Sequence, residues 1–132
     1  MATRTKTRSR KHYVKTILYA FEYMHTNNCV HRDLKPENVM IGAFGEVVLM
    51  DWGIAMSVAD SHGREPEKRI RLAGTPAYMA PEMVSPGGHQ ICEQTDIYLL
   101  GAIRVESLEG HPPQAAGTLF EALALATSER PP

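Results

Sequence analysis

Residues 30–53 read VHRDLKPENVMIGAFGEVVLMDWG, and this stretch decides how the rest of the chain is organised. Two short apolar runs, 39–41 and 47–50, stand on either side of a five-residue connection that contains two glycines. Apolar runs joined by a short glycine-containing loop are typical of a β-hairpin. The stretch therefore predicts a hairpin with polar residues at its open end.

The expected register of this hairpin brings oxygen ligands together. If Ile41 pairs with Val48, the same antiparallel ladder places Asn38 opposite Asp51. Amide and carboxylate oxygens suit Mg²⁺, which usually binds one or two carboxylates together with the phosphates of a substrate. Asp33 lies five residues before Asn38, in a loop within reach of the same place. The residues alone thus predict a magnesium site of three oxygen-bearing side chains.

Three motifs resemble those of the protein kinase superfamily and occur in the family's order. Residues 31–38, HRDLKPEN, are similar to the catalytic loop, and residues 51–53, DWG, to the metal-binding DFG triplet. Residues 74–82, GTPAYMAPE, resemble the end of the activation segment. An HRD triplet by itself would be weak evidence, whereas three ordered motifs point to a bacterial-type serine/threonine protein kinase.

The resemblance implies an α+β, mainly α fold: the larger lobe (C-lobe) of a protein kinase with a small catalytic hairpin, truncated at both ends. In the family a Gly-rich loop and a VAIK-type lysine precede the catalytic loop, but the thirty residues before His31 contain no glycine. We expect a basic disordered end (1–11), a partial kinase domain (12–128) and a tail (129–132). Without the ATP-covering lobe, this fragment alone is expected to be inactive.

The resemblance assigns roles to four residues. Asp33 corresponds to the carboxylate that accepts the proton of the substrate hydroxyl, although a turn-capping aspartate is the alternative. Lys35 corresponds to the lysine that faces the transferring phosphoryl, and an exposed surface lysine is its alternative. Asn38 and Asp51 correspond to the metal ligands. The implied reaction is ATP γ-phosphoryl transfer to protein serine or threonine hydroxyls, with ATP and Mg²⁺ bound through Lys35, Asn38 and Asp51.

The activation segment implied by the resemblance covers residues 54–73. Arg32 corresponds to the arginine that pairs with a phosphate on this segment, and a structural salt bridge is the alternative. Ser57 and Ser61 are the possible phosphorylation sites, although exposed serines are more often unmodified. His31 is expected to be a packed, hydrogen-bonded side chain with no acid or base role.

Three further residues are expected to support the site. Thr75 corresponds to the threonine that contacts the catalytic aspartate and lysine. Asp96 corresponds to the aspartate that braces the backbone of the catalytic loop, and it also suits the first turn of a helix. Glu82 corresponds to a glutamate that pairs with a later arginine. That arginine would lie beyond Pro132, so we expect this ion pair to be unmade.

Helical periodicity and capping signals predict the other elements. Apolar residues recur at helical spacing over 12–27 and form a core stripe. A second helix is expected from Thr95 to the residue before Gly110, with Arg104 at a position where its neighbours predict an apolar side chain. Residues 118–121, TLFE, have the spacing of a capping box and open a third helix.

Two alternatives remain for the function. Trp52 replaces the family's usual phenylalanine, and antibiotic-modifying kinases also follow their metal aspartate with tryptophan. Those enzymes lack a segment like GTPAYMAPE, and Lys35 and Gly53 fit protein kinases better. The other alternative is a catalytically inactive kinase remnant that acts as a protein-binding or regulatory module.

Composition limits the partners. The net charge of −1 provides no electrostatic case for nucleic acid or a membrane surface. Cys29 and Cys92 lack the spacing of metal ligands, so both are expected to be reduced thiols in a cytosolic setting. No apolar run approaches the roughly 20 residues that span a bilayer. We therefore expect a cytoplasmic protein whose partners are ATP and a protein substrate.

Overall fold

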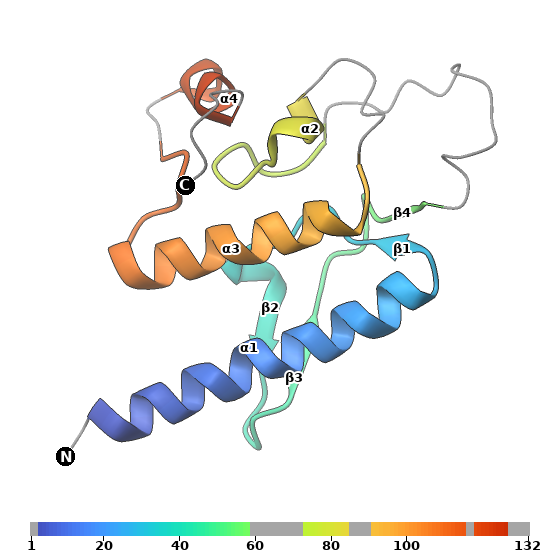
Figure 1. The fold of residues 1–132 in the computed structure, drawn as a ribbon. Helices are drawn as coiled ribbons and strands as arrows, with labels where there is room; N and C mark the ends of the chain where they lie inside the picture. The colour runs from blue at the N-terminus through green and yellow to red at the C-terminus, as the bar shows by residue number, and fades with distance from the viewer. Residues whose placement is uncertain (1–2, 59–72, 85–90, 116–117, 127–132) are drawn as a thin grey trace.

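The computed structural model describes residues 3–58, 73–84, 91–115 and 118–126. The elements in chain order are α1 (Thr3–Thr26), β1 (Cys29–Val30), η1 (Pro36–Asn38), β2 (Val39–Ile41), β3 (Val47–Leu49), β4 (Met56–Ser57), α2 (Pro81–Val84), α3 (Glu93–Glu109) and α4 (Leu119–Ala126). Strands β1 and β4 form one antiparallel pair, and β2 and β3 form another (Figure 1). The expected α+β, mainly α composition is observed.

Helix α1 begins at Thr3, earlier than the periodicity indicated. Residues 1–11 were expected to be a disordered end, yet the backbone from Thr3 onward is helical. Neither glycine nor proline interrupts this segment, and its lysine and arginine residues have favourable helix propensity. None of the helices in the described residues is both long enough and apolar enough to cross a membrane.

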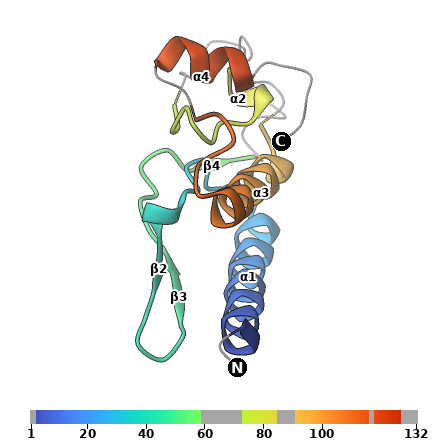
Figure 2. The ribbon, with the colours of Figure 1, turned by 90° about the vertical axis from the view of Figure 1, so that its left-hand side faces the viewer.

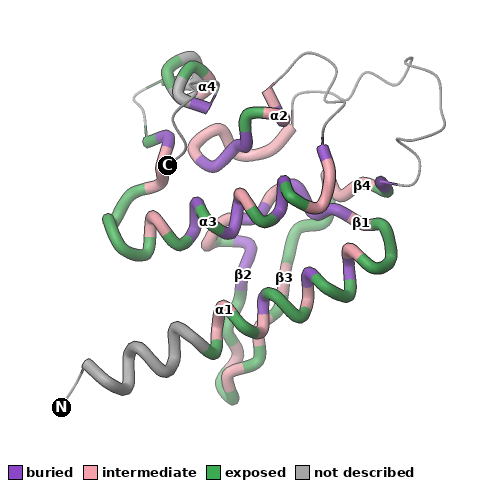
Figure 3. Tube along the Cα trace, in the orientation of Figure 1, coloured by how far each residue is buried: buried purple, intermediate pink, exposed green. Residues whose placement is uncertain are grey.

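The core lies where α1, β1 and α3 meet. Helix α1 contributes Ile17, Phe21 and Met24, and α3 contributes Leu99 and Ile103, all of them buried. Figure 3 shows buried segments along both helices and along the start of β2. Figures 1 and 2 show the β2–β3 hairpin beside α1, which it contacts through β3. The core therefore holds the base of the hairpin and leaves its tip exposed.

The hairpin forms as expected, but its predicted register is wrong by one residue. Ile41 pairs with Val47 instead of Val48. As a result Asn38 lies opposite Met50, whose N–H donates to the Asn38 carbonyl oxygen at 2.8 Å. Because side chains alternate between faces, a one-residue slip changes which residues share a face. The pairing of Asn38 with Asp51, from which the metal site was predicted, is therefore not the observed one.

The turn of the hairpin sets this register. Gly42 donates its N–H to the Glu46 carbonyl oxygen at 2.8 Å, so pairing continues beyond the strands and leaves a three-residue loop. Gly45, the last residue of the loop, has φ of 86°, a left-handed conformation that glycine adopts easily and that such loops favour. An odd number of loop residues is incompatible with the Ile41–Val48 pairing, which needs an even number.

Helix α3 begins two residues before the predicted cap. Cys92 is the N-cap residue, and Thr95 occupies the third helical position, where its hydroxyl accepts the N–H of Cys92 at 3.2 Å. Gly110, with φ of 85°, ends the helix as predicted. Arg104 is exposed, so the expected cost of burying it does not arise.

Two smaller predictions are confirmed. The capping box of α4 is reciprocal: the N–H of Thr118 donates to Glu121 Oε2 at 3.1 Å, and the N–H of Glu121 donates to Thr118 Oγ1 at 3.2 Å. Cys29 and Cys92 are free thiols, both partly buried.

Candidate functional site

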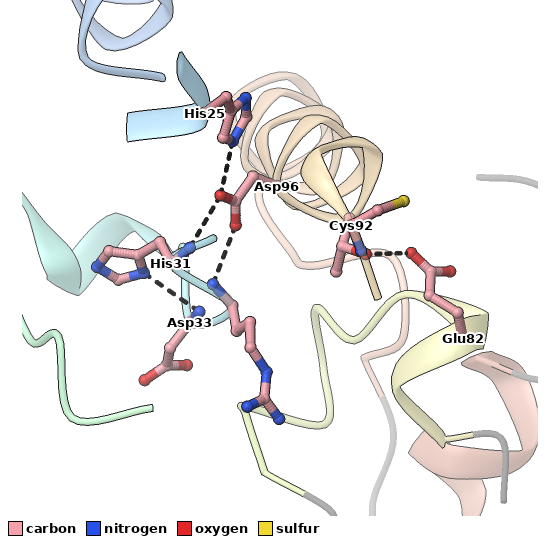
Figure 4. Close-up of polar contacts among 8 residues, drawn as sticks. His25, His31, Asp33, Glu82, Cys92 and Asp96 are labelled. Carbon is pink, nitrogen blue, oxygen red and sulfur yellow. Dashed lines mark hydrogen bonds and ion pairs between the residues drawn. The ribbon is translucent and has the colours of Figure 1, made fainter. Parts of the chain in front are cut away.

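Helix α3 holds the loop that contains the predicted catalytic residues through Asp96. The Asp96 side chain is fully buried. Its Oδ2 accepts the N–H of His31 at 2.9 Å, and its Oδ1 accepts the N–H of Arg32 at 3.0 Å. Figure 4 shows His25 on the other side of the same carboxylate, with its Nε2 3.0 Å from Oδ2. The contact that the resemblance implied for Asp96 is therefore present, and His25 adds one that the sequence did not indicate.

Arg32 occupies a strained backbone conformation. Its φ of 73° is left-handed, which costs a non-glycine residue about 1–2 kcal/mol. Its guanidinium is buried and donates from one terminal nitrogen to the Ile54 carbonyl oxygen at 3.2 Å, while Nε has no partner among the described residues. Burial lowers the pKa of this guanidinium, and the charge of Asp96 partly opposes the shift. The fold therefore keeps Arg32 in a strained backbone conformation with its positive charge buried.

Four predicted residues form one hydrogen-bonded group. Lys35 Nζ donates to Thr75 Oγ1 at 2.9 Å, and the same hydroxyl donates to Asp33 Oδ1 at 2.8 Å. Asn38 Nδ2 donates to the Asp33 carbonyl oxygen at 2.8 Å and, at 3.3 Å, to Asp33 Oδ2. The Asp33 carboxylate is thus oriented on both oxygens and linked through one hydroxyl to an ammonium group. The sequence separation between Asp33 and Thr75 makes this a tertiary contact.

The ring of His31 is fixed in one neutral tautomer. Nε2 lies 2.9 Å from the Met50 carbonyl oxygen, which only accepts, so Nε2 carries the hydrogen. Nδ1 accepts the N–H of Asp33 at 3.2 Å. The ring is fully buried. His31 is therefore the packed, hydrogen-bonded histidine that the sequence predicted, and it joins the end of β3 to the catalytic loop.

Asn38 and Asp51 are the candidate metal ligands. Asn38 uses Nδ2 for both of its side-chain hydrogen bonds, which leaves its amide oxygen as the ligand atom. Asp51 is exposed, and its φ of 56° interrupts the strand conformation directly after the pair that Asn38 makes with Met50. The described residues contain no group of three His, Cys, Asp or Glu side chains arranged for a metal. An amide and a carboxylate still suit Mg²⁺, which takes its other ligands from phosphates and water.

Glu82 has a hydrogen-bond partner that the sequence did not indicate. Its Oε1 accepts a hydrogen bond from Thr95 Oγ1 at 2.7 Å, which Figure 4 draws as the dashed line that ends at Glu82. No arginine pairs with Glu82 within the part of the chain that is described. The contact arises because α3 begins earlier than the sequence predicted. Thr95 therefore lies inside the helix, with its hydroxyl directed at α2.

The loop after Thr75 is held by a tyrosine that the sequence reasoning missed. Tyr78 donates its hydroxyl to Glu106 Oε2 at 2.7 Å and is buried. Burial raises the pKa of the Tyr78 phenol, and the hydrogen bond to Glu106 and its charge raise it further. No local pattern signals this contact, because the partners lie on different elements and only the fold brings them together.

Tyr78→Phe is expected to lower the free energy of unfolding by about 1 kcal/mol at neutral pH, because it removes this hydrogen bond. The raised pKa also makes a pH prediction. Its folded value lies above the unfolded value of about 10, so the contribution of Tyr78 to wild-type stability is constant below about pH 10 and falls at higher pH. Urea unfolding should show a smaller loss of stability at alkaline pH in Tyr78→Phe than in wild type. Some fall should remain, because burial also raises the pKa of Tyr13 and Tyr98; an unchanged fall would contradict the assignment.

Only one of the two predicted phosphorylation sites lies within the described residues. Ser57 lies in β4, opposite Cys29 of β1, and is exposed. Ser61 lies outside the described residues.

Comparison with known proteins places the chain among protein kinases. The protein kinase domain family matches residues 2–127. The chain is 42% identical over 120 residues to the serine/threonine-protein kinase PknD of Protochlamydia amoebophila, covering 80% of this chain and 12% of that protein. It is 35% identical over 115 residues to the serine/threonine-protein kinase PAK 1 of Mus musculus, covering 87% and 20%. The chain therefore spans only a minor part of the length of these relatives.

Proposed function

The chain belongs to the protein kinase domain family, and from this premise we propose that it serves ATP γ-phosphoryl transfer to serine or threonine hydroxyls of a protein. The observation that carries the proposal is the hydrogen-bonded group in which Thr75 joins Lys35 to Asp33. It combines an oriented carboxylate with a nearby positive charge, as transfer of a phosphoryl group to a hydroxyl requires. We also propose that the described fold is the larger lobe of such a kinase.

In this mechanism Asp33 is the general base. Its carboxylate is partly exposed and is held by Thr75 on one oxygen and by Asn38 on the other. A substrate hydroxyl that approaches this carboxylate would be oriented by it and lose its proton to it. Lys35 places a positive charge beside the same group, where it would stabilise the charge on the transferring phosphoryl.

Asn38 and Asp51 are proposed to hold Mg²⁺, which would neutralise charge on the phosphates of bound ATP. The amide oxygen of Asn38 and the exposed carboxylate of Asp51 are hard oxygen ligands. Next to them, the hairpin face formed by Met40, Val48 and Met50 is apolar and exposed. Such a face is available to pack against an apolar part of a ligand or a partner.

Mn²⁺ is a direct probe of this metal site, because the chain contains one tryptophan, Trp52, next to Asp51. Mn²⁺ is expected to quench Trp52 fluorescence, and Asp51→Asn should require at least about tenfold more Mn²⁺ for the same quenching, because loss of a direct ligand should cost no less than loss of a residue that only orients a ligand. Glu46→Gln is the matched control, since it removes the same charge at the far end of the hairpin. Equal quenching of Asp51→Asn and wild type would exclude Asp51 as a ligand.

Arg32 is proposed to pair with a phosphate on the activation segment. Its buried guanidinium has an unpartnered Nε within the described residues, and Ser57 is exposed on the neighbouring strand β4. A phosphate supplies several charge-assisted acceptors for such a donor. Ser61 is the other candidate. Phosphopeptide mapping that found neither serine modified in the active protein would exclude this proposal.

The proposed function is tested by incubating the native full-length protein with labelled Mg·ATP, a mixed protein substrate and small hydroxylated antibiotics. We expect label on serine and threonine. Label on a small hydroxylated antibiotic instead would favour the alternative that Trp52 suggested. Binding of a protein without transfer of label would favour a regulatory module, for which the exposed apolar hairpin residues are the supporting observation. We further propose a cytoplasmic location, where ATP is available and the free thiols of Cys29 and Cys92 stay reduced.

A further inference from the structure

Gln114 is a buried polar residue that the proposed mechanism does not use. It lies in the segment that follows α3, and only 4% of its surface is exposed. Its backbone N–H donates to the Ala77 carbonyl oxygen at 3.2 Å, and the N–H of Ala115 donates to the Pro112 carbonyl oxygen at 3.1 Å. Figures 1 and 2 show this segment beside the loop that precedes α2. Gln114 therefore contacts that loop from a turn in which prolines 112 and 113 restrict the backbone.

The side-chain amide of Gln114 joins this loop to α3. Its Nε2 donates to the Met79 carbonyl oxygen at 3.4 Å and to the Tyr98 hydroxyl oxygen at 3.0 Å. A carbonyl oxygen only accepts hydrogen bonds, so the nitrogen of the amide, and not its oxygen, faces Met79. The bond to Tyr98, which lies on α3, fixes the orientation of the amide. Gln114 therefore holds two carbonyl groups of one short loop, that of Ala77 through its backbone and that of Met79 through its side chain.

The amide of Gln114 is only partly satisfied. Its Oε1 is buried and has no hydrogen-bond partner within the described residues. A buried acceptor without a partner costs free energy, and a partly satisfied polar group is less favourable than an apolar side chain of similar size. Methionine is an apolar side chain of that kind, unbranched and flexible. Stability alone would therefore favour methionine over glutamine at this position, which points to a role in the placement of the loop.

The loop that Gln114 holds is joined to Asp33 by two hydrogen bonds. Tyr78 lies between the two residues whose carbonyl groups Gln114 binds, and its N–H donates to the Thr75 carbonyl oxygen at 2.9 Å. Thr75 Oγ1 in turn donates to Asp33 Oδ1 at 2.8 Å. A shift of residues 77–79 would therefore move the hydroxyl group that orients the Asp33 carboxylate.

We propose that Gln114 is a positioning residue that anchors residues 77–79 and, through them, holds Thr75 against Asp33. The amide acts from outside the site, because its own contacts are with the loop and with Tyr98. The effect on catalysis rests on the proposed function, because it requires Asp33 to act on a substrate hydroxyl. The anchoring itself does not depend on that function.

Hydrogen–deuterium exchange of the native full-length protein tests the anchoring. Gln114→Met removes the amide and keeps the backbone N–H that donates to Ala77. The N–H groups of Tyr78 and Met79 are hydrogen-bonded within the loop, so their exchange reports its opening. Exchange over residues 77–80 should rise about twofold to tenfold, the factor that corresponds to loss of one hydrogen bond. Gln94→Met is the matched control, because Gln94 is exposed on α3.

Exchange elsewhere in the chain separates anchoring from a general loss of stability. Peptides from α3 should keep wild-type protection in Gln114→Met, because methionine fills a similar volume and removes an unsatisfied oxygen. Tyr98→Phe is an independent variant that removes the bond orienting the amide, so it should raise exchange over the same loop by a smaller factor. Unchanged exchange over 77–80 in Gln114→Met would overturn the proposal. A rise of equal size in α3 would also overturn it, because the change would then be general destabilisation.

Phosphoryl transfer by the same variants is measured separately. Gln114→Met should lower kcat/KM for the protein substrate by about tenfold, because small displacements of a catalytic group reduce the rate steeply. The KM for Mg·ATP should stay unchanged, since none of the contacts described for Gln114 involves Asn38 or Asp51. Faster loop exchange with wild-type kcat/KM would reject the link from the loop to Asp33. Absence of transfer in the wild-type protein would reject the proposed function and leave the exchange result intact.

Discussion

Replacing Asp33 by asparagine is expected to reduce kcat for phosphoryl transfer by about 10²- to 10⁴-fold, the range attributed to a general base. Asparagine has nearly the same shape, and its amide oxygen can still accept the hydrogen bond from Thr75. It cannot take a proton from the substrate hydroxyl. The loss should therefore be in kcat, measured at saturating Mg·ATP with the native full-length protein.

Glu37→Gln is the matched control for this substitution. Glu37 is an exposed carboxylate in the same loop, so its replacement removes the same charge near the site without removing the proposed base. We expect its kcat to remain near that of wild type. An Asp33→Asn protein with kcat within about tenfold of wild type would contradict the role of Asp33, since a general base contributes more than that.

Replacing Asp96 by alanine is expected to be the most destabilising change, with a loss of about 3 kcal/mol or more in the free energy of unfolding. The N–H groups of His31 and Arg32 would lose their acceptor, and each unsatisfied buried donor costs about 1–3 kcal/mol. The Nε2 of His25 would lose its partner as well. Arg32 would also be free to leave its left-handed conformation. Urea unfolding of the chain measures the loss.

Two further variants test whether the loss of stability comes from the hydrogen bonds of Asp96. Glu93→Ala removes another acidic residue from the first turn of α3 and should cost only about 0.3–1 kcal/mol, the value of a charge near a helix terminus. Asp96→Asn keeps one acceptor oxygen but turns an amide donor toward an N–H, so its stability should lie between that of wild type and alanine. If Asp96→Ala and Glu93→Ala were equally stable, the bracing role of Asp96 would be rejected.

The motifs predicted the residues of the site better than their arrangement. Asp33, Lys35, Asn38 and Thr75 were named from the sequence, and they do form one hydrogen-bonded group. The hairpin was predicted from its two apolar runs, yet its register was not. A loop of three residues and one of four are both compatible with a glycine-rich connection, and only the left-handed Gly45 selects between them.

The missed contacts share a physical cause. The bond from Tyr78 to Glu106 and the bond from Thr95 to Glu82 join residues on different elements. Neither pair has a spacing that periodicity or capping rules detect. Trp52 was recognised as a departure from the family, but the acceptor of its indole N–H is a backbone carbonyl, and every residue has one.

The sequence by itself determined the family, the identity of the candidate catalytic residues, and the local elements whose signals are short-range: the hairpin, the end of α3 at Gly110 and the capping box of α4. Only the tertiary structure decided how these residues meet. Asp96 approaches the catalytic loop from α3, and Thr75 joins Lys35 to Asp33 from a segment some forty residues away in the chain. Local signals depend on neighbouring residues along the chain, whereas these contacts depend on which elements the hydrophobic core packs side by side.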